Sequence, residues 1–306
     1  MALRAAEAAA GVYVRFPPGW QNVLLPITPR GATALGTTLY TASRRGPLLA
    51  QRALWAVARA GGARFLPGPR EHWNTPVEDP AWTRLWEAWS NLLGGVDGLA
   101  IYERPQRSRT GLLLALWSPG ASLVVRLRHG TSGITAEQRV ASSARELAAV
   151  TFRVPRVLGQ GTEDGWHWVA SEGMASRPHR PVLKITSGLL AEVAATVERG
   201  LERPAVTPSH WRPAHGDLTP WNLRRAAHTT WLIDWEDAGW APPYADAVYF
   251  EACAQTLGVR PAGPARTGTG EARNYWREKI SARASGDADA GLQARLLDAL
   301  AMPEQR

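Results

Sequence analysis

Residues 215–222 read His-Gly-Asp-Leu-Thr-Pro-Trp-Asn, and residues 231–236 read Trp-Leu-Ile-Asp-Trp-Glu. We call these stretches the first motif and the second motif. The first motif places Asp217 five positions before Asn222, and the second places Asp234 after an apolar run that is typical of a buried strand. Eleven residues separate Asn222 from Asp234. Two carboxylates and one amide therefore lie close in sequence, in a pattern that calls for a chemical explanation.

The residue types in the two motifs suit phosphoryl transfer. This reaction needs little covalent help from a protein, but it needs an acceptor hydroxyl aimed in line and metal ions that hold the polyphosphate. An aspartate can receive the hydroxyl proton, while a second aspartate and an asparagine amide oxygen are hard ligands that suit Mg²⁺. Asp217 and Asn222 also have the D-x-x-x-x-N spacing of the kinase template. The pattern therefore favours a site for a nucleotide and Mg²⁺.

The two motifs resemble those of the aminoglycoside phosphotransferase and choline kinase family, the small-molecule branch of the protein-kinase-like fold. In that family the first motif reads HGDxxxxN and the second reads IDWE or IDFE. The resemblance implies that Asp217 is the catalytic base and that Asn222 and Asp234 bind Mg²⁺. It also implies that His215 braces the loop and that Asp246 tethers it. For Asp246, an ordinary helix N-terminal cap is the alternative.

The same resemblance assigns the residues that hold the α and β phosphates of the nucleotide. A kinase uses a lysine on its third strand, paired with a helix glutamate. Aligned on Leu-Val-Val at residues 123–125, the lysine position holds Arg126, whose planar guanidinium differs in shape from an ammonium group. Its expected partner is Glu137, with Glu146 as the alternative.

Two further segments have the positions of nucleotide-binding elements. The loop 104–111 stands where a kinase covers the phosphates, and Ser108 and Arg109 in it have hydrogen-bond donors, although a plain solvated hairpin loop fits equally well. Glu172 and Met174 resemble the hinge between the lobes, where backbone groups meet the base. The loop lacks the G-x-G-x-x-G pattern.

These features predict an α+β, protein-kinase-like, two-lobed fold with a small antiparallel-sheet N-lobe and a mainly helical C-lobe. An N-terminal region of unknown role is expected at residues 1–96, the N-lobe at 97–174 and the C-lobe at 175–306. The apolar periodicities predict strands at 99–103, 111–117, 122–127, 152–158 and 165–171, and helices at 51–61, 81–93, 135–150, 182–201, 244–256 and 288–301. The tryptophans of the 81–93 helix are expected to pack in a core.

Composition limits the possible partners and compartments. The 306 residues have a formal net charge of +8, and 33 of the 35 basic residues are arginine, because Lys184 and Lys279 are the only lysines. These charges are scattered, and no nucleic-acid motif is present, so we expect no nucleic-acid partner. Cys253 is the single cysteine and is expected in a core. No segment reads as a signal peptide or a membrane span, so a cytoplasmic enzyme is expected.

The sequence therefore predicts a kinase that uses ATP or GTP with Mg²⁺ and phosphorylates a hydroxyl of a sugar, an aminoglycoside or an amino alcohol. A catalytically inactive pseudokinase that binds nucleotide or acts as a scaffold is the alternative, because Arg126 replaces lysine. A protein kinase is disfavoured, because only nine residues (235–243) are left for a peptide-docking segment. The acidic residues of the stretch 271–306 are too dispersed to indicate a polycationic acceptor.

Overall fold

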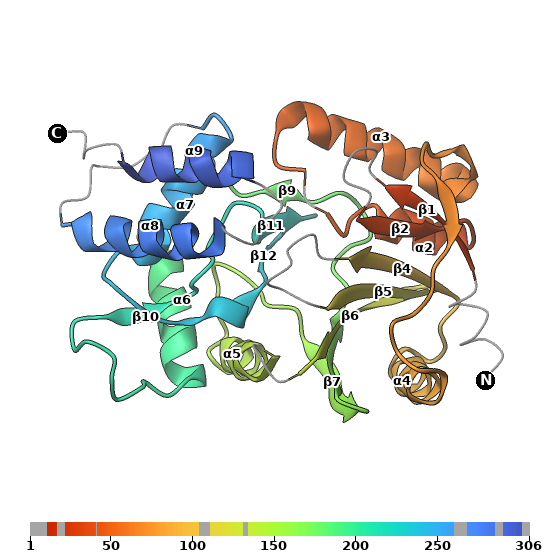
Figure 1. Cartoon of the computed structure of the whole chain (residues 1–306), viewed down its shortest axis with the longest axis horizontal. Helices are drawn as coiled ribbons and strands as arrows, with labels where there is room; N and C mark the ends of the chain where they lie inside the picture. Colours follow the sequence, from red (N-terminus) through yellow and green to blue (C-terminus); the bar gives the residue numbers. More distant parts are fainter. Residues whose placement is uncertain are drawn as a thin grey trace. The chain divides into compact units, whose positions relative to one another are not determined.

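The computed structural model describes residues 11–16, 22–40, 42–103, 111–130, 134–259, 268–284 and 290–301. The chain divides into two compact units, which we describe separately (Figure 1). The first unit comprises Met1–Pro105, Arg109–Thr131 and Arg156–His179. The second comprises Gln106–Ser108, Ser132–Pro155 and Arg180–Arg306.

An antiparallel sheet forms the centre of the first unit. Along β6, Leu123, Val125 and Leu127 are buried on one face while the intervening side chains are more exposed, as the period of two in a strand requires. All pairings between the strands of this sheet are antiparallel. In spatial order the strands are β3 (Arg70–His72), β1 (Val12–Phe16), β2 (Val23–Pro26), β4 (Gly98–Glu103), β5 (Leu112–Ser118), β6 (Ala121–His129), β8 (Trp166–Glu172) and β7 (Val157–Glu163).

Helices cover both faces of this sheet (Figure 1). Leu99 and Ile101 of β4 share a core with the tryptophans of α4, whereas Ala100 between them packs with Leu35 of α2. Because neighbouring strand residues point to opposite faces, α4 and α2 lie on opposite sides of the sheet. α4 ends where Gly94 adopts φ +76°. The helices of this unit are α2 (Arg30–Gly36), α3 (Arg45–Gly61), the short η1 (Gly62–Phe65) and α4 (Asp79–Leu93).

The second unit is mainly helical, with short strands between the helices (Figure 1). α5 packs along α6, where Ser143 Oγ donates to Thr196 O at 2.9 Å and a Cβ on Gly200 would lie 3.0 Å from Val140 Cα. The helices are α5 (Ile134–Glu146), α6 (Ser187–Gly200), η2 (Trp235–Asp237), α7 (Ala245–Thr256), α8 (Gly270–Ala284) and α9 (Ala290–Ala301). The strands are β9 (Arg180–Pro181), β10 (Arg212–Ala214), β11 (Leu223–Ala226), β12 (Thr229–Leu232) and β13 (Gly239–Ala241).

The fold class predicted from the sequence is confirmed: the chain is α+β, with an antiparallel sheet in its first part and helices in its later part. The tryptophans of α4 are core residues, since Trp82 and Trp89 are almost fully buried. Cys253 is likewise buried, in α7. Three strands from the first 96 residues, β1 to β3, belong to the same sheet as β4 to β8.

Several predicted boundaries were wrong. The helix predicted at 182–201 begins only at Ser187, because Thr186 Oγ1 accepts from Leu189 N at 3.1 Å and caps it, while Val182 N bonds to Leu223 O. The strand predicted at 152–158 is displaced to Val157–Glu163, and Arg153 makes only an isolated bridge with Trp231. α2 and α8 were not predicted, and the helix predicted at 135–150 ends at Glu146.

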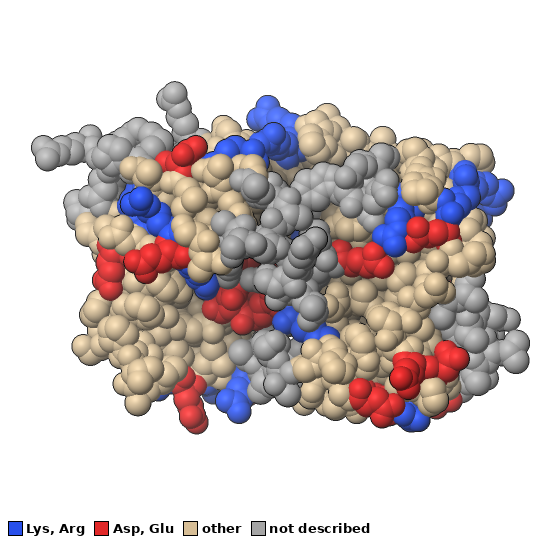
Figure 2. Space-filling view, in the orientation of Figure 1, with Lys and Arg blue, Asp and Glu red and all other residues tan. Residues whose placement is uncertain are grey.

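Within the described ranges, no helix has the length and hydropathy needed to cross a lipid bilayer. Figure 2 shows one face of the molecule, on which acidic and basic side chains lie mixed rather than in one large patch of a single sign.

Two glycines of the first unit provide a test of the packing. A Cβ on Gly36 at the end of α2 would lie 2.4 Å from Leu25 Cδ2 and 2.6 Å from Ala100 Cβ, whereas one on Gly46 in α3 would meet nothing within 4 Å. We expect Gly36→Ala to destabilise the protein by about 1–3 kcal/mol through overpacking. Gly46→Ala is expected to stabilise it by up to about 1 kcal/mol through helix propensity. Urea unfolding measures both, and equal effects at the two sites would contradict this account of α2.

Candidate active site

A tight β-hairpin brings Asn222 and Asp234 together. β11 and β12 pair from Leu223↔Leu232 to Ala226↔Thr229, which leaves a two-residue turn at 227–228. The ladder continues one step beyond the strands, because Ile233 N donates to Asn222 O at 3.1 Å. The eleven residues between Asn222 and Asp234 are therefore the hairpin together with Ile233. It places the metal-ligand candidates of the two motifs at the same end of the ladder.

The side chain of Asn222 is bonded to Asp217. Its Nδ2 donates to Asp217 O at 3.0 Å and to Asp217 Oδ2 at 2.9 Å. Because both partners are acceptors, the amide orientation is fixed, and Asn222 Oδ1 makes no hydrogen bond to the described residues. Asn222 is itself buried, and its backbone N–H is held by Thr219 Oγ1 at 3.1 Å. The loop of the first motif thus closes on itself and fixes the Asp217 carboxylate.

His215 connects the two motifs. Its Nδ1 accepts from Asp217 N at 3.2 Å, and its Nε2 faces Ile233 O at 3.2 Å, so the proton lies on Nε2. The ring packs against Trp235 with 4.4 Å between centroids. Complete burial lowers the pKa of His215 to about 4. The side chain is therefore neutral at pH 7 and bonds to the backbone of both motifs.

Asp246, in the first turn of α7, bonds to the backbone of the first motif. Its Oδ2 accepts from His215 N at 2.7 Å and its Oδ1 from Gly216 N at 3.1 Å. Burial raises the pKa of Asp246 to about 6, against the lowering effect of these two N–H groups. The N-cap residue of α7 is Tyr244, and the Asp246 carboxylate bonds to the backbone of the first motif. Its role as a tether stays a prediction.

Two residues of the motifs have left-handed backbones. Gly216 has φ +76°, and a Cβ there would lie 1.9 Å from Asp237 O, so only glycine fits. Asp234 has φ +69° and ψ 57°, a conformation that Asp adopts more readily than most residues. This turn carries the chain from β12 directly into η2.

The nucleotide-binding candidates are less fully described. Arg126 lies in β6 of the first unit, half-buried on the face that alternates with Leu123, Val125 and Leu127. Glu172 ends β8, where its Oε1 accepts from Arg156 N at 2.9 Å, and Met174 follows in the same unit.

The partners expected for Arg126 are on α5. Glu137 belongs to this helix, but its side chain lies outside the described residues. Glu146, the alternative, forms an ion pair with Arg199 of α6 at 3.1 Å. Ser108 and Arg109 also lie outside the described residues. The structure therefore brings together His215, Asp217, Asn222, Asp234 and Asp246, the candidates of the two motifs and of α7. The nucleotide contacts of the remaining candidates stay predictions.

Sequence reasoning missed three residues at the site. Thr219 holds Asn222 N, and Trp235 packs against His215. Lys279 of α8 lies with its Nζ 3.4 Å from Gly216 O. Only Lys279 gave a usable signal, because it is one of two lysines among 35 basic residues.

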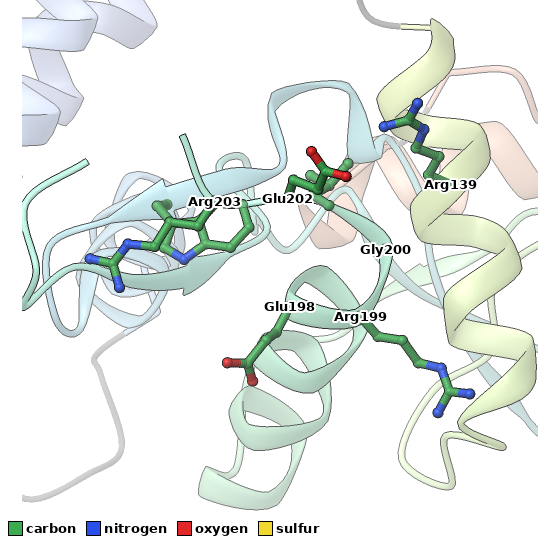
Figure 3. A pocket seen from close by; sticks show the side chains of 8 residues that line it. Arg139, Glu198, Arg199, Gly200, Glu202 and Arg203 are labelled. Atoms are coloured by element: carbon green, nitrogen blue, oxygen red, sulfur yellow. The ribbon is translucent and has the colours of Figure 1, made fainter. Parts of the chain in front are cut away.

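A separate hollow of about 550 Å³ lies in the second unit, at the C-terminal end of α6 (Figure 3). Arginine and glutamate side chains surround it, and in Figure 3 they point in different directions rather than toward one centre. None of its lining residues belongs to either motif. They are Arg139, Glu198, Arg199, Gly200, Leu201, Glu202, Arg203 and Trp240.

Comparison with known proteins agrees with the motifs. Residues 180–278 match the phosphotransferase enzyme family, and this range contains both motifs and Asp246. The resemblance that the motifs predicted is thereby confirmed over this range. A comparison with curated protein sequences gave no match.

Solved structures that match this chain include three phosphotransferases. Spectinomycin phosphotransferase APH(9)-Ia, in complex with ADP and spectinomycin, is 9% identical with a TM-score of 0.49, covering 75% of this chain and 96% of that one. A thermostable mutant of aminoglycoside phosphotransferase APH(4)-Ia, in a ternary complex with ADP and hygromycin B, is 12% identical with a TM-score of 0.42, covering 70% of this chain and 88% of that one. An aminoglycoside-3′-phosphotransferase of type VIII is 21% identical with a TM-score of 0.38, covering 70% and 98%.

The two buried ionisable groups predict a characteristic pH dependence of stability. Between pH 3.8 and about 6 the folded state holds a proton on Asp246 that the unfolded state has lost, so this group makes stability fall as the pH rises. Between about 4 and 6.5 the unfolded state holds a proton on His215 that the folded state lacks, so this group makes stability rise with pH. The two effects largely cancel in the wild type.

Asp246→Asn removes one of these effects. We expect its unfolding free energy, measured by urea denaturation from pH 4 to pH 7, to rise with pH by about 3 kcal/mol more than that of the wild type. Asp298→Asn, at an exposed position of α9, is the matched control and should follow the wild type. Parallel curves for Asp246→Asn and the wild type would show that Asp246 is ionised over the whole range.

Proposed function

We propose, on the premise that residues 180–278 form part of a phosphotransferase, that this chain transfers the γ-phosphate of ATP or GTP to a hydroxyl of a small molecule. The observation that carries the proposal is the double hydrogen bond from Asn222 Nδ2 to Asp217. It holds the expected base and one expected metal ligand in a single fixed arrangement. The other expected ligand, Asp234, is tied to the same point by the bond from Ile233 N to Asn222 O.

In this proposal Asp217 is the catalytic base. Its carboxylate is half-buried and held by Asn222, so it is oriented before an acceptor binds. It takes the proton of the acceptor hydroxyl while the hydroxyl oxygen bonds to the γ-phosphorus. The bond from that phosphorus to the bridging oxygen breaks, and the nucleoside diphosphate leaves with the electron pair.

Asn222 and Asp234 are the proposed ligands of Mg²⁺. The amide oxygen of Asn222 makes no bond to the described residues and is a hard donor, as is the Asp234 carboxylate. Among the described residues there is no cluster of three or more His, Cys, Asp or Glu side chains that would hold a metal by itself. This fits Mg²⁺, which takes few protein ligands and completes its coordination with phosphates and water. When bound, Mg²⁺ would neutralise charge on the β and γ phosphates.

The remaining contacts of the nucleotide rest on the sequence. We propose that Arg126 contacts the α and β phosphates and that the loop with Ser108 and Arg109 contacts the γ-phosphate. Backbone groups of the segment from Glu172 to Met174 are proposed to contact the base. The ion pair of Glu146 with Arg199 favours Glu137 as the partner of Arg126.

The proposal is tested by substituting the base. Asp217→Asn keeps the shape of the side chain but cannot accept a proton, so we expect turnover to fall on the order of 100-fold or more. The KM for MgATP should stay within about threefold, because the base does not hold the nucleotide. The measurement is ADP formation with Mg²⁺, ATP and a panel of sugars, aminoglycosides and amino alcohols.

Asp298→Asn serves again as the control and is expected to match the wild type. Turnover of Asp217→Asn within a few-fold of the wild type would overturn the assignment of the base. A wild-type protein that binds MgATP but converts none of the acceptors would favour the inactive pseudokinase that Arg126 left open.

A further inference from the structure

Lysine is rare in this chain, and one of its two lysines contacts the first motif. Of 35 basic residues 33 are arginine, and the exceptions are Lys184 and Lys279. Lys184 is exposed, in the segment before α6. Lys279 is half-buried on α8 with its ammonium beside the backbone of Gly216. A chain that uses arginine almost everywhere therefore has a lysine beside Gly216, whereas Arg224 Nε donates to Trp221 O at the far end of the same motif.

The peptide groups around Gly216 lie between two opposite charges. The Asp246 carboxylate accepts from Gly216 N at 3.1 Å, and Lys279 Nζ lies 3.4 Å from Gly216 O. The latter distance is long for a hydrogen bond, so the interaction is mainly that of an ion with a carbonyl dipole. The anion meets the N–H group and the cation meets the C=O group, so both charges hold the peptide groups of Gly216 in one orientation. The carbonyl that Lys279 contacts belongs to the peptide bond that leads into Asp217.

A rigid aromatic surface supports the ammonium group. Lys279 Nζ lies 5.0 Å from the ring centroid of Trp276 and 5.7 Å from that of Tyr275, within the range of cation–π attraction. Trp276 is fully buried, stacks on Tyr249 with 3.8 Å between centroids, and donates from Nε1 to Ala245 O at 2.8 Å. Ala245 immediately precedes Asp246. α8 is therefore fixed to the same turn of α7 that holds the loop.

The geometry also indicates why arginine does not occupy this position. An ammonium is a compact point charge with three donors, whereas a guanidinium is a larger planar fork. The Lys279 ammonium lies between the face of Trp276 and the carbonyl of Gly216, so this position holds one small cation. A guanidinium would either lie flat on the indole and lose the carbonyl, or push the loop away.

We infer that Lys279 is a positioning residue, which holds the peptide bond before Asp217 so that the carboxylate of Asp217 faces the acceptor hydroxyl. This inference rests on the proposed function, since it assigns Lys279 a part in orienting the base. It predicts that the ammonium matters for turnover rather than for nucleotide binding, and that arginine does not replace it.

The test compares Lys279→Met, which keeps the length of the stem without its charge, with Lys279→Arg. For Lys279→Met we expect turnover of MgATP to fall on the order of 10- to 100-fold, with the KM for MgATP within about threefold. Amide hydrogen exchange in the peptide spanning the first motif should become about tenfold faster. Lys279→Arg is expected to lie closer to Lys279→Met than to the wild type in both measurements.

Lys184→Met and Lys184→Arg are the matched controls, at the exposed lysine, and should stay within about twofold of the wild type. If Lys279→Met turns over MgATP and exchanges within about twofold of the wild type, the inference is wrong. Wild-type turnover in Lys279→Arg would overturn the requirement for an ammonium. Should Lys279→Met fail to fold, Lys279→Arg decides alone, because it retains the charge.

The exchange measurement separates this inference from the proposed function. It needs no acceptor, so it reports on the loop even if the wild type converts none of the compounds tested. Faster exchange in Lys279→Met, together with no turnover by the wild type, would support the contact of Lys279 with the loop and reject the proposed enzymatic activity. Turnover by the wild type, together with unchanged exchange in Lys279→Met, would support the proposed enzymatic activity and reject the role of Lys279.

Discussion

The candidate site depends on one buried carboxylate that accepts two backbone N–H groups. Asp246 receives both His215 N and Gly216 N, and thereby fixes the left-handed turn from which Asp217 projects. A buried charge is costly unless it is hydrogen-bonded, and here the two N–H groups would equally lack partners without it. The carboxylate and the two N–H groups therefore stabilise each other, and the loop has one conformation in which all of them are hydrogen-bonded.

A second constraint acts through the backbone of the β11–β12 hairpin. The pairing of Leu223 with Leu232 sets the positions of Asn222 and Asp234, which follow at the same end of the hairpin. His215 connects this hairpin to the first motif through its bond with Ile233 O. Side-chain packing then completes the arrangement, with the ring of Trp235 against His215. The arrangement of the site thus rests on the main-chain ladder together with the side chains of Asn222 and His215, which bond to the backbone of the motifs.

The sequence predicted the fold class and the long periodic elements, but not the elements that lack a pattern of their own. α4 was predicted because its tryptophans recur at helical spacing, and β5 and β6 because their apolar runs are long. α8 was missed because its charged and aromatic residues show no clear apolar stripe. The start of α6 was misplaced because Val182, Leu183 and Ile185 continue its apolar pattern, although Thr186 caps the helix after them. At the candidate site, the two motifs indicated His215, Asp217, Asn222 and Asp234 before the structure was known. The contact of Lys279 comes from a distant helix, which no local pattern reveals.

The length of the hairpin has a consequence for how this sequence can change over generations. A single inserted residue within β11 or β12 would shift the ladder by one step and rotate every following side chain to the other side, which separates Asn222 from Asp234. The turn at 227–228, with its exposed Ala227 and His228, lies outside this constraint. Insertions and deletions that survive in descendants of this gene are therefore expected at the turn and not in the strands. The lengths of β11 and β12 would then be inherited unchanged, because they set the positions of Asn222 and Asp234.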